Sequence, residues 1–237
     1  MDERDIANEL TRVLEAEANA ILRIKKNPPV DAMVSLVREL AECRGKIITS
    51  GCGTSAIAAK KIAHSLNCIN RPSAFLPPSD AVHGGLGMLS EGDIVILISK
   101  GGGTSELLNM MPVCKIKRTR LVGVSENPES AIAKESDIFL HIHAGREPCP
   151  FNMLATASTL AVIAAFDAIC IALMQYMGYT KEQFRVIHPG GAVGERLAEA
   201  EARAEAGTEA VAEAGVEARA EAGTEAGAEA KAETKAK

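Results

Sequence analysis

A glycine-rich loop with a carboxylate behind it is the stretch of this sequence best suited to chemistry. It reads Ser99-Lys100-Gly101-Gly102-Gly103-Thr104-Ser105-Glu106, after the apolar run Ile94–Ile98 and before a helical pattern. This order predicts a strand, a loop and a helix. Backbone N–H groups and hydroxyls in such a loop bind anions, usually phosphate, at the positive end of a helix dipole. We expect Glu106 to act on a ligand whose phosphate is bound by Ser99, Lys100, Gly103, Thr104 and Ser105.

A second loop of this kind, Gly51-Cys52-Gly53-Thr54-Ser55-Ala56, also follows an expected strand and opens an expected helix. It matches the dinucleotide fingerprint G-x-G-x-x-G/A, but that fingerprint also requires an acidic residue about twenty positions later. The corresponding stretch, Ser73–Leu76, contains no acid. We therefore favour anion binding by Gly53, Thr54 and Ser55 over dinucleotide binding, with a purely structural tight turn as the alternative.

Three more titratable side chains lie in loops rich in glycine or proline. Glu147 lies in Gly145–Pro150, where a carboxylate held on a strand-end loop suits a general base. His188 precedes Pro189-Gly190-Gly191, a turn from which a ring can reach a site on this or another subunit. His83 precedes Gly84-Gly85 and is a candidate substrate contact. The five His residues show no metal-ligand spacing, so we expect neither a metal nor a cofactor.

Charge and composition exclude several classes of function. Residues 199–237 contain ten Glu and five Lys or Arg, which leaves 21 acidic and 21 basic residues in 1–198. A neutral body and the scarcity of aromatic residues argue against nucleic-acid binding. The charged N-terminus and interrupted apolar runs indicate no signal peptide and no membrane span. Six Cys without a C-x-x-C pair favour reduced thiols and a cytoplasmic protein.

Helical patterns alternate with short apolar runs along most of the chain. After two helices, near residues 3–26 and 31–44, we expect strands at 46–50, 73–76, 93–98, 120–124 and 137–142. The helices between and after them are expected at 53–66, 105–116, 129–135 and 153–177. This alternation predicts a doubly wound three-layer α/β sandwich with a five-stranded parallel sheet, whose ligand lies at the carboxyl ends of the strands. We expect one domain over 1–198 and a solvated, low-complexity Ala/Glu-rich tail over 199–237.

Taken together, the motifs resemble those of arabinose-5-phosphate isomerases, a branch of the SIS (sugar isomerase) superfamily. The resemblance runs from about residue 5 to residue 197 and rests on Gly51–Ser55, Ala81–Met88, Ser99–Glu106, Glu147–Pro150 and His188–Gly191. It implies a flavodoxin-like SIS fold and a homotetramer with active sites between subunits; we expect the SIS-only form, without a CBS pair. It also implies interconversion of arabinose 5-phosphate and ribulose 5-phosphate through ring opening and an enediol.

The resemblance further implies that Glu106, Glu147 and His188 are catalytic. We expect Glu147 to move the proton between C1 and C2, and His188 to open the ring or polarise the carbonyl. Glu106 would orient hydroxyls or share the proton transfer.

This sequence departs from the family pattern at three places. Thr54 occupies the position of a critical family lysine, and Lys100 is a candidate substitute for its charge. Gly103 replaces a carboxylate, and Pro77-Pro78 replaces a His-Pro segment that can bind inhibitory zinc. Because of Thr54, the alternative function is a phosphosugar-binding SIS module with a regulatory role or weak catalysis.

Overall fold

The computed structural model describes residues 1–191 and 194–196, and it divides the chain into two compact units, Met1–Thr180 and Lys181–Lys237. Each unit is described by itself. The second contains α9 (Lys181–Ile187) followed by His188. The domain boundary at residue 198 stays a prediction, and the tail over 199–237 lies outside the described residues.

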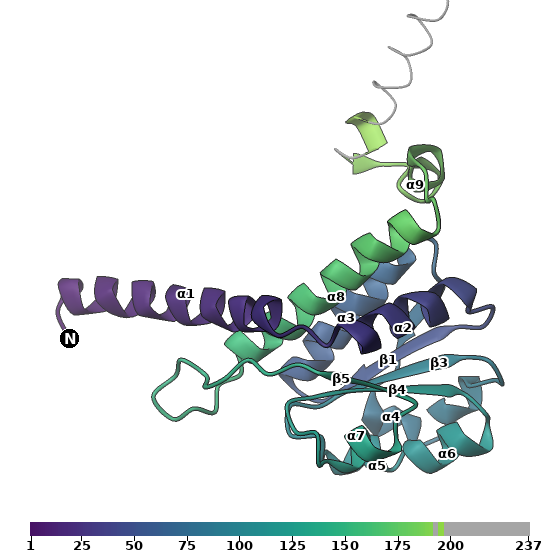
Figure 1. Cartoon of the computed structure of the whole chain (residues 1–237), viewed down its shortest axis with the longest axis horizontal. Helices are drawn as coiled ribbons and strands as arrows, with labels where there is room; N and C mark the ends of the chain where they lie inside the picture. The colour runs from purple at the N-terminus through teal and green to yellow at the C-terminus, as the bar shows by residue number, and fades with distance from the viewer. Residues whose placement is uncertain (192–193, 197–237) are drawn as a thin grey trace, which may run out of the picture. The chain divides into compact units, whose positions relative to one another are not determined.

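The first unit is built around a five-stranded parallel sheet with the strand order β2-β1-β3-β4-β5 (Figure 1). The strands are β1 (Ile47–Gly51), β2 (Ser73–Phe75), β3 (Ile94–Ile98), β4 (Arg120–Ser125) and β5 (Ile138–His141). This is the flavodoxin-like order, in which the chain reverses direction between β1 and β3. The expected fold class is confirmed.

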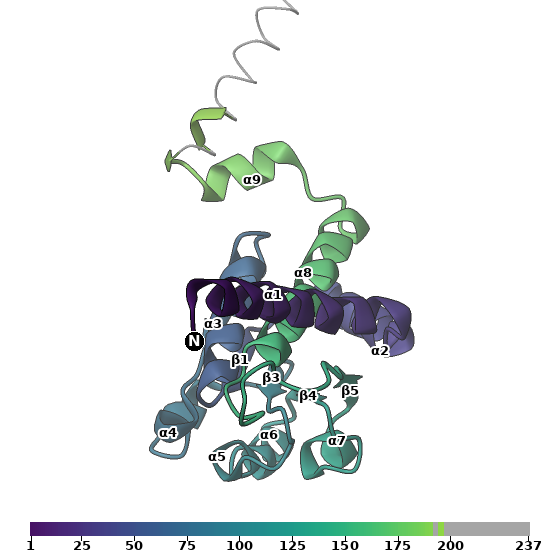
Figure 2. The ribbon, with the colours of Figure 1, turned by 90° about the vertical axis from the view of Figure 1, so that its left-hand side faces the viewer.

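Helices cover both faces of the sheet, so the unit has three layers (Figures 1 and 2). One face carries α1 (Glu3–Lys26), α2 (Val30–Glu42), α3 (Thr54–Asn67) and α8 (Ala157–Tyr176). The other carries α4 (Pro78–Ala81), the 3-10 turn η1 (Gly85–Met88), α5 (Ser105–Leu108), α6 (Met111–Ile116) and α7 (Ala131–Glu135). Alternate residues of β3 point to opposite sides: Ile94, Ile96 and Ile98 join the α8 core, while Val95 and Leu97 join the other.

The helix expected over residues 105–116 is two helices. α5 ends at Leu108 and α6 begins at Met111. Pro112 has no N–H for the carbonyl of Leu108, and its ring crowds that carbonyl, so a continuous helix is interrupted here. The connection 77–89 contains α4 and η1 rather than only irregular loop.

Helix α8 is long and apolar enough to cross a membrane by composition, yet it is a core helix of this unit. Its residues Ala161, Phe166, Ile169 and Leu173 are buried in the core shared with the sheet. It packs against α1, α2 and α3. The expected buried helix near 153–177 is therefore present, starting at Ala157.

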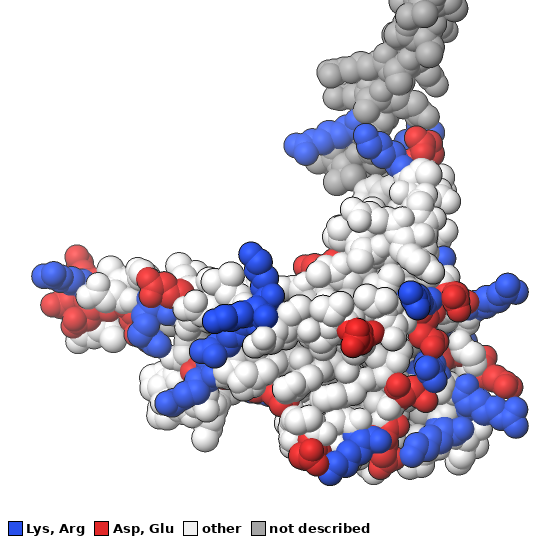
Figure 3. All heavy atoms as spheres, in the orientation of Figure 1, with Lys and Arg blue, Asp and Glu red and all other residues white. Residues whose placement is uncertain are grey.

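Charged side chains of both signs are interspersed over the face of the first unit shown in Figure 3, as its balanced composition requires.

Candidate active site

Both glycine-rich loops lie at the carboxyl edge of the sheet, after the neighbouring strands β1 and β3. Gly53 has φ +58°, and a Cβ on Gly51 would overlap the Ser55 backbone, so the first turn requires both glycines. Thr54 begins α3 with its side chain exposed, and Ser55 lines a pocket behind it. Burial raises the pKa of Cys52 in this loop, and the negative charge of Glu106 adds to the effect.

The loop after β3 is held by hydrogen bonds within itself. The Ser99 and Thr104 hydroxyls are 2.8 Å apart, and Gly102 N donates to Ser99 Oγ at 3.1 Å. Gly102 has φ +67° and a Cβ there would overlap Ser130, whereas a Cβ on Gly103 would meet open space. The loop therefore needs Gly102 for its conformation, while Gly103 is a position that a larger side chain can occupy.

Glu106 lies on the first turn of α5 and is exposed. Its own backbone N–H and the Ser105 hydroxyl, 2.9 Å from Oε2, hold its pKa below the ordinary value. α5 has only one turn, so the dipole expected to assist phosphate binding is smaller than that of a long helix.

Glu147 is the most enclosed of the expected catalytic residues, with 1% of its side chain exposed. Oε1 accepts from Lys100 Nζ at 2.6 Å and from the Ser158 hydroxyl, and Oε2 accepts from Thr156 N at 3.0 Å. Burial raises its pKa, but the hydrogen bonds from Lys100, Ser158 and Thr156 outweigh burial and bring the pKa below its ordinary value.

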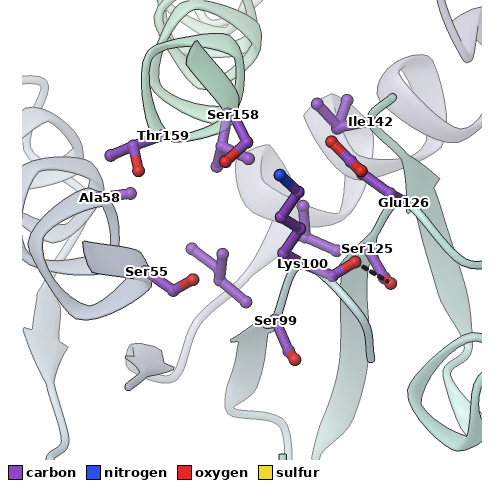
Figure 4. Close-up of a pocket in the computed structure, with 12 residues that line it drawn as sticks. Ser55, Ala58, Ser99, Lys100, Ser125, Glu126, Ile142, Ser158 and Thr159 are labelled. Atoms are coloured by element: carbon purple, nitrogen blue, oxygen red, sulfur yellow. Dashed lines mark hydrogen bonds between the residues drawn. The ribbon is translucent and has the colours of Figure 1, made fainter. Parts of the chain in front are cut away.

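Lys100 extends from the end of β3 into a pocket between α3, β4 and α8 (Figure 4). The pocket is also lined by Ser55, Ser99, Glu126, Ser158 and Thr159. The free space is about 20 Å³, which is room for a water molecule but not for a sugar phosphate. Lys100 and Glu126 also line an open depression of about 580 Å³ that includes Asn127 and His143.

Two more predicted residues are histidines. His83 is exposed between α4 and η1, with its backbone N–H donating to Asp80 O. His188 belongs to the second unit, where Nδ1 lies 2.9 Å from Phe184 O and its ring stacks on that of Phe184. The roles of His83 and His188 stay predictions.

Sequence reasoning missed Ser158 and Glu126. Ser158 is a hydroxyl on the first turn of a helix whose other buried residues are apolar, and that contrast is the signal that could have found it. Glu126 follows β4, at the same edge as the glycine-rich loops. Among the residues that the structure describes, no group of three or more His, Cys, Asp or Glu side chains could hold a metal.

Sequence comparisons match this chain to one protein family. The family model of the SIS domain matches residues 39–172. The arabinose 5-phosphate isomerase KdsD of Pseudomonas aeruginosa is 37% identical over 167 residues, covering 70% of this chain and 51% of the relative. KdsD of Yersinia pestis is 40% identical over 155 residues, covering 65% and 47%. This chain thus spans about half the length of the curated relatives it matches.

Solved structures extend the match over most of the first unit. A Listeria monocytogenes protein assigned as a sugar-phosphate isomerase is 59% identical with a TM-score of 0.79, covering 80% of this chain and 100% of that one. An Escherichia coli protein in complex with arabinose 5-phosphate is 29% identical with a TM-score of 0.76, covering 80% and 100%. A Bacteroides fragilis protein assigned as a phosphosugar isomerase in capsule formation is 32% identical with a TM-score of 0.73, covering 78% and 98%.

Proposed function

Because this chain belongs to the SIS domain family, we propose that it interconverts an aldose phosphate and a ketose phosphate. The observation that carries the proposal is the pairing of a buried carboxylate, Glu147, with a cation of the glycine-rich loop, Lys100, at 2.6 Å. That arrangement puts an acid–base group beside a phosphate-binding loop, at the edge of the sheet where ligands of this fold bind.

The proposed substrate pair is arabinose 5-phosphate and ribulose 5-phosphate. Its support is the identity to arabinose 5-phosphate isomerases and the likeness to the E. coli protein in complex with arabinose 5-phosphate. In this proposal the loops after β1 and β3 bind the phosphate through Gly53, Thr54, Ser55, Ser99, Lys100, Gly103, Thr104 and Ser105. His83 contacts the substrate from the connection after β2.

The proposed reaction moves one proton between adjacent carbons. After ring opening, which we assign to His188, Glu147 removes the proton from C2 while the carbonyl oxygen on C1 gains a proton, which gives the enediol. Glu147 then returns its proton to C1 while the hydroxyl on C2 loses its proton and becomes the new carbonyl. Glu106 orients the substrate hydroxyls or shares this proton transfer. A carboxylate suits this work when its pKa rises toward the operating pH.

The alternative function is a phosphosugar-binding module. Two observations favour it: Thr54 offers no charge where the family has lysine, and both oxygens of Glu147 are engaged in the ligand-free structure. We further propose a homotetramer with sites between subunits, and a cytoplasmic location for a chain whose six cysteines are free.

A coupled assay with arabinose 5-phosphate, ribulose 5-phosphate and other sugar phosphates tests the proposal. We expect turnover by the wild type and a loss of at least about a hundredfold in Glu147→Gln, since proton transfer by a positioned side chain contributes that much. Glu129→Gln is the matched control, because its side chain is 79% exposed at the surface. Ligand-induced stabilisation without turnover would instead indicate the binding module.

A further inference from the structure

The side chain of Lys100 lies between Glu147, with which it is paired, and two neighbouring hollows of the surface. Lys100 lines both the small pocket and the open depression beside it. In Figure 4 its ammonium lies between Ser158 and Thr159 on one side and Glu126 and Ile142 on the other. A ligand in the depression therefore meets Lys100, whose ammonium is paired with Glu147.

The two partners of this ion pair differ in how firmly they are held. Glu147 is 1% exposed and also accepts from the Ser158 hydroxyl and Thr156 N, so it keeps its place without Lys100. The Lys100 carbonyl is fixed by Ser125 Oγ and Glu126 N, both at 2.9 Å. Its side chain is 36% exposed and its ammonium is at the end of a flexible four-carbon stem. Lys100 is the partner that can move.

Two other charged side chains near this ion pair have hydrogen-bond partners of their own. Glu126 accepts from Ala144 N at 3.1 Å, and Arg12 of α1 donates to Pro148 O at 2.6 Å, next to Glu147 in sequence. Among the described residues, Lys100 is the cation paired with Glu147 in the structure.

We propose that Lys100 is a substrate-operated latch: a phosphate group draws its ammonium away from Glu147, which releases the carboxylate for proton transfer. This inference rests on the proposed function for its substrate. A phosphate dianion competes well for an ammonium because it carries more charge than a carboxylate. Glu147 then stays buried without its cation, and burial makes it a stronger base.

The latch makes the carboxylate and the phosphate competitors for one ammonium. Removing the charge of Glu147 must therefore strengthen anion binding, while removing Lys100 must weaken it, because coupling between two partners is reciprocal. A salt bridge with only a structural role predicts no gain in phosphate affinity when Glu147 is neutralised.

Calorimetric titration of the full chain with inorganic phosphate, and separately with arabinose 5-phosphate, tests this. We expect Glu147→Gln to bind inorganic phosphate at least about fivefold tighter than wild type, and Lys100→Met at least about fivefold weaker. Lys100→Arg keeps the charge and should retain binding. Glu126→Gln is the matched control, since it removes a carboxylate of the same pocket that is not paired with Lys100.

The latch is overturned if Glu147→Gln leaves phosphate affinity unchanged, or if Glu126→Gln tightens binding equally. A second test needs no variant, should Glu147→Gln fail to fold. In a crystal structure of the wild type with inorganic phosphate, we expect Lys100 Nζ to lie beyond ion-pair distance, about 4 Å, from Glu147 and to contact the phosphate. An intact ion pair beside bound phosphate would overturn the latch.

The experiments distinguish failure of the latch from failure of the proposed isomerase function. If no sugar phosphate is turned over but phosphate affinity follows the expected pattern, the isomerase proposal fails and the latch remains as a binding device. If a sugar phosphate is turned over but Glu147→Gln leaves the affinity for inorganic phosphate unchanged, only the latch is wrong.

Discussion

Gly102 and Gly103 are adjacent in the glycine-rich loop after β3, but a side chain at each position would meet different surroundings. Gly102 has φ +67°, and a Cβ there would overlap Ser130, whereas Gly103 has open space around the same position. We expect Gly102→Ala to lower the free energy of unfolding by about 2–4 kcal/mol, from left-handed backbone strain and overpacking. Gly103→Ala should change it by less than about 0.5 kcal/mol. Urea unfolding of both variants measures this, and equal effects would contradict it.

The Lys100–Glu147 pair should make stability depend on pH in a defined direction. Because the pKa of Glu147 lies below its ordinary value of 4.5, its contribution is present above pH 4.5 and is lost as pH falls through the folded pKa. In Lys100→Met, burial acts without the cation and the pKa rises. The stability difference between wild type and Lys100→Met should therefore be largest near neutral pH and shrink as Glu147 is protonated.

Unfolding free energies measured between pH 7 and pH 3 test this pH dependence. Lys134→Met is the matched control, because its ion pair with Glu129 is at the surface, with side chains 59% and 79% exposed. A wild-type minus Lys100→Met difference that stays constant over this range would show that Glu147 is not the titrating partner.

At the scale of elements, helix α8 links the core to the site. Phe166 is 1% exposed at the centre of the core, and Ser158 on the first turn of the same helix contacts Glu147. We expect Phe166→Ala to cost about 3–5 kcal/mol of stability. Phe151→Ala, in the preceding loop and 78% exposed, should cost less than about 0.5 kcal/mol. Thermal and urea unfolding measure both, and similar losses would refute the assignment of α8 as a core helix.

Most of the elements are predictable from sequence because they have local signals. The β-branched run Ile94–Ile98 and the glycines after it mark a buried strand and its turn, and β3 is found there. The split between α5 and α6 has a local cause as well, Pro112, whose effect the apolar spacing of residues 105–116 does not reveal.

The pairing inside the site is not predictable in the same way. Lys100 and Glu147 are separated by 47 positions, and their contact depends on how β3 and the loop before α8 meet at the edge of the sheet. Charge and spacing suggest a role for each residue alone. The ion pair between them depends on side-chain directions and burial, which no local pattern encodes.

At the scale of the whole molecule, α1 carries apolar side chains that the first unit does not cover. Ile6, Leu10 and Leu14 are four residues apart, so they form one stripe, and all three are exposed. Only Ala20 and Ile24 of this helix are buried. On the opposite side of α1, Arg12 donates to the carbonyl of Pro148 in the Glu147 loop.

We expect this stripe to be an assembly surface of the proposed homotetramer. Leu10→Glu combined with Leu14→Glu would bury two charges in the interface, so the variant should dissociate to a smaller species at micromolar concentration. Asn8→Glu, an exposed position on the opposite side of α1, is the matched control and should leave the mass unchanged. Sedimentation velocity measures the mass. If the double variant and wild type sediment alike, the subunits associate through another surface, because two unpaired carboxylates in a closed apolar interface cost several kcal/mol.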